Sequence, residues 1–181
     1  MRSPFGARST ALAVVLAASA FGGACARPEP SAVALGEHGI GPLLLDRSYD
    51  DAVAAARRLA PDSLLAGPGC GGLDEIRYSG HMAEFPVSLM AMARNDRLVE
   101  VELGLDAPLT AANEAACLGL RDRFAAPFVD RFGAASGHWT IDKPVSREHL
   151  LGVGPVVVVA RWFVTGNSCY VSARYGDAGT G

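Results

Sequence analysis

Two helical segments, each followed by strands, limit the folds that this chain can adopt. Apolar residues of the first segment recur at spacings of four, three and four: Tyr49, Val53, Ala56 and Ala60. Those of the second segment share one helix face in the same way: Cys117, Leu120, Phe124 and Phe128. Strands are predicted after the first helix at 73–78, 87–93 and 98–103, and after the second at 138–142, 156–164 and 168–175. The sequence therefore predicts an α+β fold of two helix-plus-three-strand units, forming one antiparallel sheet with both helices packed on one face.

Local signals place the helix ends. Ser48 opens the first helix, and Pro61 ends it. Thr110 is the predicted cap of the second helix, which closes at Gly133. Pro127 lies inside that helix and is expected to kink or split it, because proline lacks the N–H that the helix needs.

The predicted strands differ in how their faces are covered. Val99, Val101 and Leu103 alternate with Glu100 and Glu102, which indicates one buried face and one wet face. The run 156–159 is apolar at every position, so this strand is expected to be central and covered on both faces.

The first 24 residues are typical of a secretory signal. Arg2 and Arg8 give a basic start, an apolar run covers 11–21, and small residues lead into Cys25. This pattern is similar to bacterial lipoprotein signals, so we expect cleavage before Cys25 and lipidation of its thiol. Ordinary signal cleavage at Ala18-Ser19-Ala20 or Ala24-Cys25-Ala26 is the alternative and would give a soluble secreted protein.

Cleavage before Cys25 leaves 157 of the 181 residues, which suffices for one domain with its own core. We expect a Pro-containing tether at 25–38 and a single domain at 39–175. The domain divides into two repeats, 39–105 and 106–175, and a disordered tail follows at 176–181.

The net charge of the chain limits the classes of partner that it is expected to bind. Arg2 and Arg8 are two of the 16 basic residues, and the leader holds none of the 19 acidic ones, so the mature chain carries −5. A mildly acidic chain without a basic cluster argues against nucleic acid and against anionic lipid headgroups. We expect contact with a membrane only through the N-terminal lipid.

Export to an oxidising compartment favours pairing of cysteines. Cys117 lies on the helix face that packs on the sheet, and Cys169 is in phase with Val171 and Ala173, which face that helix. The sequence therefore predicts a disulfide between Cys117 and Cys169. Cys70, in a Gly-rich loop, is the expected free thiol. Two reduced core cysteines are the alternative.

No segment carries a recognisable catalytic motif or a ligand spacing for metal. The four histidines are not spaced as metal ligands, and each is expected at a surface or in a loop: His38, His81, His138 and His149. Cys70 with His81 as its base is a catalytic alternative. Glu100 and Glu102 are expected on the wet sheet face, with acid–base or calcium chemistry as the alternative. We therefore predict no enzyme activity, no cofactor and no metal.

The last strand supplies the candidate binding residues. Tyr170, Ser172 and Arg174 alternate with the inward-facing Val171 and Ala173. Tyrosine and arginine are enriched at interfaces, so this face is a candidate protein-binding surface. A plain solvated sheet face is the alternative.

The segment Gly39-Ile40-Gly41-Pro42-Leu43, followed by a helix with an acidic start, resembles the opening of small exported bacterial proteins. That unit is similar to the repeats of the β-lactamase-inhibitory protein and to small lipoproteins of outer-membrane assembly. The resemblance covers 39–103, and the sequence departs from the pattern at 44–48. It implies a non-catalytic protein-binding scaffold.

Taken with the leader, these features predict a non-catalytic cell-envelope lipoprotein that faces the periplasm and binds an envelope or secreted protein. A secreted enzyme inhibitor and a small-molecule-binding protein are the alternatives.

The leader generates one testable prediction. Cys25→Ser should move the protein from the membrane fraction to the soluble fraction, because two or more acyl chains anchor a protein stably and the variant carries none. Detergent phase partitioning measures this, with Cys70→Ser as the control that should stay in the membrane. A soluble wild-type protein whose N-terminus is Phe21 or Arg27 would contradict the prediction.

Overall fold

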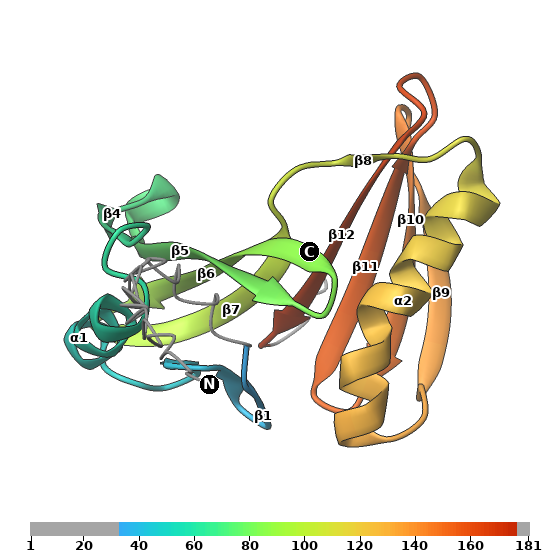
Figure 1. Ribbon diagram of the computed structural model, residues 1–181. Coiled ribbons are helices and arrows are strands. Elements are labelled where there is room, and N and C mark those ends of the chain that lie inside the picture. Colours follow the sequence, from blue (N-terminus) through green and yellow to red (C-terminus); the bar gives the residue numbers. More distant parts are fainter. Residues whose placement is uncertain (1–32, 177–181) are drawn as a thin grey trace, which may run out of the picture.

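A long antiparallel sheet runs through the computed structural model, which describes residues 33–176 (Figure 1). The predicted signal, Cys25, most of the predicted tether and residues 177–181 lie outside the described residues. The helices are α1 (Tyr49–Leu59) and α2 (Glu114–Phe132). The strands of this sheet are β4 (Leu65–Pro68), β5 (Asp74–Met82), β6 (Phe85–Arg94), β7 (Arg97–Leu105), β8 (Leu109–Thr110), β9 (Gly137–Asp142), β10 (Ser146–Val153), β11 (Val156–Phe163) and β12 (Ser168–Tyr175).

The strand order joins the two halves of the chain into one sheet. Along the sheet the order is β4-β5-β6-β7-β12-β11-β10-β9, and the short β8 pairs with β12. The last strand, β12, therefore lies in the middle and pairs antiparallel with β7. Two helices with a largely antiparallel sheet make a mixed α+β fold. The helix-plus-three-strand unit is not what the structure contains, because β4 and β10 bring the strands after each helix to four, with β8 as an extra short strand.

Both helices cover the same face of the sheet. Direct cross-strand partners share a face, so one row across the sheet can be followed by the register. That row is almost completely buried: Ile76, Ala91, Val101, Tyr175, Val156 and Val153. The α2 helix packs on β10, β11 and β12, and α1 packs beside β5, and their buried residues join this core.

The helix ends differ from the sequence prediction at one cap. The cap of α2 is Asn113, whose Oδ1 accepts a hydrogen bond of 2.9 Å from the Ala116 N–H, while Thr110 belongs to β8. The predicted split at Pro127 does not occur. The α2 helix continues to Phe132, because Phe124 and Phe128, on either side of the proline, are both buried against the sheet.

The strand faces also differ from the sequence prediction in two places. A register shift between Met92 and Ala93 lies in the β6–β7 pairing, and beyond it Leu98 is buried while Val99 is exposed. In β11, Val156 and Val158 are buried but Val157 and Val159 are partly exposed. The strand is central, as expected, but only one of its faces is fully covered.

Part of the predicted tether forms a strand. Three short strands form a small separate sheet: β1 (Leu35–Gly36), β2 (Gly39–Ile40) and β3 (Leu43–Leu44). Ile40 and Leu43 are fully buried in the main core, and Leu98 is hydrogen-bonded to the segment that follows, at Asp46 and Arg47. The predicted tether, 25–38, is therefore too long, because its last residues already pair with Gly39 and Ile40.

The disulfide prediction is confirmed. Cys117 of α2 and Cys169 of β12 form a disulfide with their Cα atoms 5.4 Å apart, and both are fully buried. Cys70 lies in η1 (Cys70–Gly72), is exposed, and is the free cysteine of the described residues. The bond fixes α2 to the central strand of the sheet.

Removing this bond by Cys117→Ala with Cys169→Ala should lower the free energy of unfolding by roughly 4 kcal/mol, because the closed loop spans 52 residues. Urea unfolding under non-reducing conditions measures the difference. Cys70→Ser is the matched control and should change stability by less than about 0.5 kcal/mol, because Cys70 is exposed. Equal unfolding midpoints for the double variant and the wild type would rule out a stabilising bond.

Candidate binding surface on the open face of the sheet

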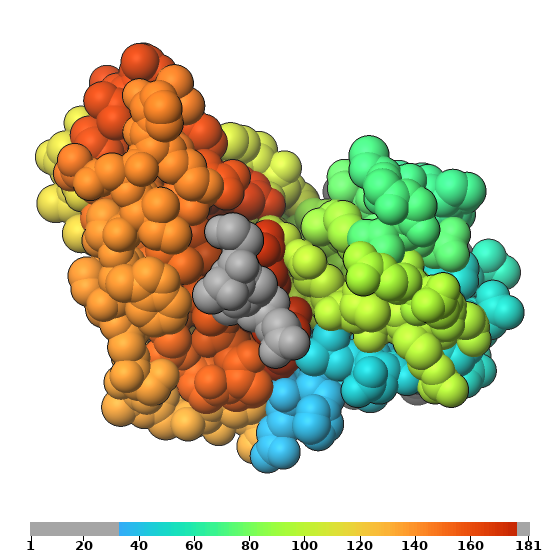
Figure 2. Space-filling model, turned by 180° about the vertical axis from the view of Figure 1, so that it is seen from behind, coloured from blue at the N-terminus to red at the C-terminus, as the bar shows by residue number. Residues whose placement is uncertain are grey.

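The face of the sheet opposite the helices, called the open face below, carries the candidate site. Two rows of cross-strand partners cross from one half to the other on it. The first row is Trp139, Leu150, Val159, Ser172, Gly104 and Ser88, and the second is Val157, Arg174, Glu102, Met90 and Arg77. Figure 2 views the molecule from the side opposite α2, where the strands of the two halves lie side by side and the surface is hollowed between them.

Tyr170 lies directly over the backbone of β7. A Cβ atom placed on Gly104 would be 2.1 Å from the Tyr170 Oη and 3.0 Å from its Cζ, so the ring occupies the space that any other side chain would need. Glycine in a strand often marks such a close approach. Burial raises the pKa of Tyr170, and the carboxylates of Glu102 and Asp106 act in the same direction. The hydroxyl therefore stays protonated and is able to donate.

Arg174 connects the two halves on the same face. Its Nε lies 3.0 Å from Oε1 of Glu100, and its Nη2 donates to Oε2 of Glu102 at 3.3 Å. The side chain of Arg174 remains half exposed, whereas that of Glu102 is largely buried. The two glutamates predicted on a wet face thus lie on it, but their charge is balanced by an arginine from the other half.

Of the three residues predicted to bind, the structure brings two to the surface. Tyr170 is partly exposed and Arg174 is exposed. Ser172 lies on the open face as predicted but is only 7% exposed, so it supports the surface without presenting a group to a partner. Next to Tyr170, a small hollow of about 180 Å³ is bordered by Arg77, Met90, Glu102 and Asp106.

A second charged cluster on the open face joins β10, β11 and the turn between β9 and β10. Oε1 of Glu148 accepts hydrogen bonds from Arg161 Nε at 2.6 Å and from Lys143 Nζ at 2.8 Å. Burial acts to raise the pKa of Glu148, but these two cations outweigh it and hold the pKa below its ordinary value. The carboxylate is therefore ionised and paired, which makes it a link between strands.

One histidine is placed differently from the prediction. His149 is buried in β10, on the helix side of the sheet, with Nδ1 3.2 Å from Thr140 Oγ1. Its Nε2 lies 2.8 Å from Oε1 of Glu114, but the pair lacks hydrogen-bond geometry. The expectation that all four histidines lie at surfaces or in loops is wrong for His149, because β10 was not predicted.

The catalytic alternative is not assembled. Cys70 precedes β5, while His81 lies near the far end of that strand, and the seven steps from Asp74 to His81 span roughly 23 Å. A nucleophile and its base must lie within hydrogen-bond reach. In the described residues no group of three or more His, Cys, Asp or Glu side chains could hold a metal ion.

No helix among residues 33–176 is long and apolar enough to cross a membrane. In comparisons with known proteins, no family model matched the chain, and neither the curated proteins nor the solved structures gave a match.

The packing of Tyr170 on Gly104 gives a prediction. Gly104→Ala should lower the free energy of unfolding by about 1–3 kcal/mol, because its Cβ forces the Tyr170 ring out of place. Gly119→Ala in α2 is the matched control, since a Cβ there meets nothing within 4 Å, and it should raise stability by about 0.5–1 kcal/mol. Thermal and urea unfolding report both changes. If the free energy of unfolding of the Gly104→Ala variant equals that of the wild type, the Tyr170 ring does not pack on β7.

Proposed function

We propose that this protein is a non-catalytic, lipid-anchored cell-envelope protein that binds another protein through the open face at the junction of β7 and β12. The observation that carries the proposal is the pair Tyr170 and Arg174, held at this junction by Gly104, Glu100 and Glu102. Both side chains come from the central strand, and both are fixed by contacts with the opposite half of the molecule.

The size of the open face suits a protein partner. Eight strands lie side by side at about 4.8 Å, and eight residues of strand extend roughly 26 Å, so the face is roughly 34 Å by 26 Å. A standard interface needs about 800 Å² from each partner. A small molecule would cover only a fraction of this area, so a folded protein is the occupant that we propose.

The side chains on the face also suit a protein interface. Tyrosine, tryptophan and arginine contribute most to binding energy in protein interfaces, and the open face presents Tyr170, Trp139, Arg161 and Arg174. Trp139 and Ile141, on the outer strand β9, are each 42% exposed and add apolar area at one edge. Basic and acidic groups are paired with each other, so we expect a partner surface of mixed charge.

The repetition in the chain supports a scaffold role. We infer that the two halves are structural repeats, each a helix followed by an antiparallel sheet of four strands. Joining them edge to edge doubles the width of the open face without adding a layer. This view agrees with the implied resemblance to protein-binding repeats, and it assigns no catalytic residue.

The leader supports the proposed location in the cell envelope. A basic start, an apolar run and small residues before Cys25 are typical of a lipoprotein signal, which would present the folded part to the periplasm. The partner is then an envelope protein or a secreted protein that passes through this compartment.

A photo-crosslinking residue placed at Ser88 of the open face should give an adduct with another envelope protein in intact cells. The same residue placed at Arg58, on the exposed side of α1, should give none and serves as the matched control. Arg174→Ala should reduce the Ser88 adduct about tenfold or more, because it removes a fixed arginine from the centre of the interface. Tyr170→Phe keeps the ring over Gly104 and should reduce the adduct less.

Unfolding temperatures of the variants show whether the fold is retained. Adducts from the residue at Arg58 and none from the residue at Ser88 would show that the interface lies elsewhere than on the open face. An undiminished Ser88 adduct in the Arg174→Ala variant would show the same.

A further inference from the structure

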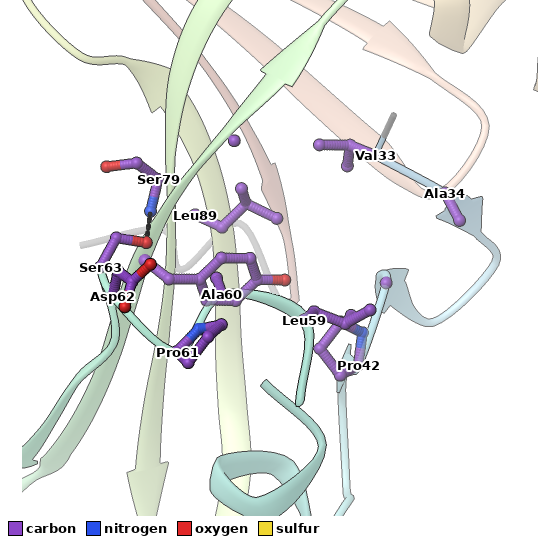
Figure 3. A pocket seen from close by; sticks show the side chains of 13 residues that line it. Val33, Ala34, Pro42, Leu59, Ala60, Pro61, Asp62, Ser63, Ser79 and Leu89 are labelled. Carbon is purple, nitrogen blue, oxygen red and sulfur yellow. Dashed lines mark hydrogen bonds between the residues drawn. The ribbon is translucent and has the colours of Figure 1, made fainter. Parts of the chain in front are cut away.

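A second cavity lies away from the open face, at the first-half end of the sheet. It has a volume of about 440 Å³ and lies between the N-terminal segment, the end of α1 and strand β5 (Figure 3). Ordinary ligand pockets in proteins measure about 300–1,000 Å³. The cavity is therefore large enough for a small organic molecule.

The cavity exists because β4 covers only part of β5. The four residues of β4 pair with Asp74–Arg77, and from Tyr78 onward β5 has no neighbouring strand on that side in the described part of the chain. Two single contacts bound the gap. The Ser79 N–H donates to Ser63 Oγ at 3.2 Å, and the Val33 N–H donates to the His81 carbonyl at 3.3 Å. Between these two contacts the described residues leave a cavity.

The walls of the cavity are mainly apolar. Side chains from three separate parts of the chain meet there: Val33, Pro42, Leu59, Pro61 and Leu89, with the ring of Tyr78. Leu59 lies at the rim and is 52% exposed. Figure 3 shows Leu59 and Pro42 on one side of the cavity and Ser63 and Asp62 on the other.

One polar group of the wall reaches the cavity. Tyr78 lines the cavity and is 6% exposed, and its hydroxyl lies beside Gly41, where an added Cβ atom would be 3.4 Å from Oη. Burial raises the pKa of Tyr78 above its ordinary value, so the phenol remains protonated and can donate. An oxygen of a ligand in the cavity could accept this hydrogen bond.

The charges around the cavity restrict the ligand further. Among residues 33–176 no lysine or arginine lines the cavity, and the carboxylate of Asp62 lies at its exposed rim. An anionic ligand such as a fatty acid would find no cation and would be repelled by Asp62. The ligand must therefore be uncharged where it enters the apolar part.

We propose that this cavity binds an uncharged, mostly hydrocarbon molecule that accepts a hydrogen bond from the Tyr78 hydroxyl through a carbonyl, ether or hydroxyl oxygen. The site uses residues that the open face does not use, so the two sites can be tested separately. Failure of one leaves the other unaffected.

The test uses 6-propionyl-2-dimethylaminonaphthalene, an uncharged fluorescent ketone whose emission depends on polarity and hydrogen bonding. Titration into the wild-type protein should show saturable binding with one site. Tyr78→Phe keeps the ring and removes the hydroxyl, so the Kd should rise about tenfold, which is the usual size of one lost hydrogen bond. The anionic dye 1-anilinonaphthalene-8-sulfonate should not compete for the site.

Two further variants occupy the cavity itself. Ala60→Phe places a ring in the space and should abolish ketone binding, whereas Ala135→Phe, on an exposed loop after α2, should bind like the wild type. Ala34→Trp is the second filling variant, and because Ala34 is exposed this change should leave the fold intact as judged by thermal unfolding. No saturable binding by the wild type, or unchanged binding by Ala34→Trp, would overturn the proposal.

Discussion

The pairing of β7 with β12 is the interaction on which the rest of the structure depends. It joins the fourth strand after α1 to the last strand of the described chain, and its register runs from Tyr175 opposite Val101 to Ser172 opposite Gly104. Only four residue pairs make this junction, yet without it the core would divide into two small sheets with one helix each. The buried row of partners passes through Val101 and Tyr175, so the junction also makes the two halves share one core.

Contacts on both faces of the sheet reinforce this short pairing. On the helix face, the Cys117–Cys169 disulfide ties β12 to α2, and on the open face Arg174 binds two glutamates of β7. Tyr170 extends the contact beyond the paired residues by lying on Gly104. The same contacts that hold the halves together fix the exposed groups of the proposed interface, so binding would cost little ordering of side chains.

Much of this fold could be predicted from the sequence where the signal is local. The helix spacing around Val53 and Phe124 gave two helices, and the phase of Cys117 and Cys169 gave their bond. The strand β10 was missed because its residues, SREHLLGV, begin with four polar positions and show no alternation. Those polar residues are buried by, or paired with, residues distant in sequence, as Glu148 is with Arg161. The sequence of the segment alone does not reveal such partners. Ser172 illustrates the same limit, because alternation predicts its face but not the neighbours that cover it.

The outer strands explain why the two proposed sites differ between the halves. In the second half, β9 pairs with six residues of β10, from Arg147 to Gly152, and leaves little of that strand uncovered. In the first half, β4 pairs with only four of the nine residues of β5. The remaining edge of β5 must be closed by other parts of the chain, and the end of α1 and the segment at Val33 close it incompletely. The cavity beside Tyr78 results from this difference in strand length. The open face, in contrast, results from a feature that both halves share, a helix on one face of the strands only. Because the cavity opens at the outer edge of the sheet and the junction lies at its centre, a ligand in one site would leave the other accessible.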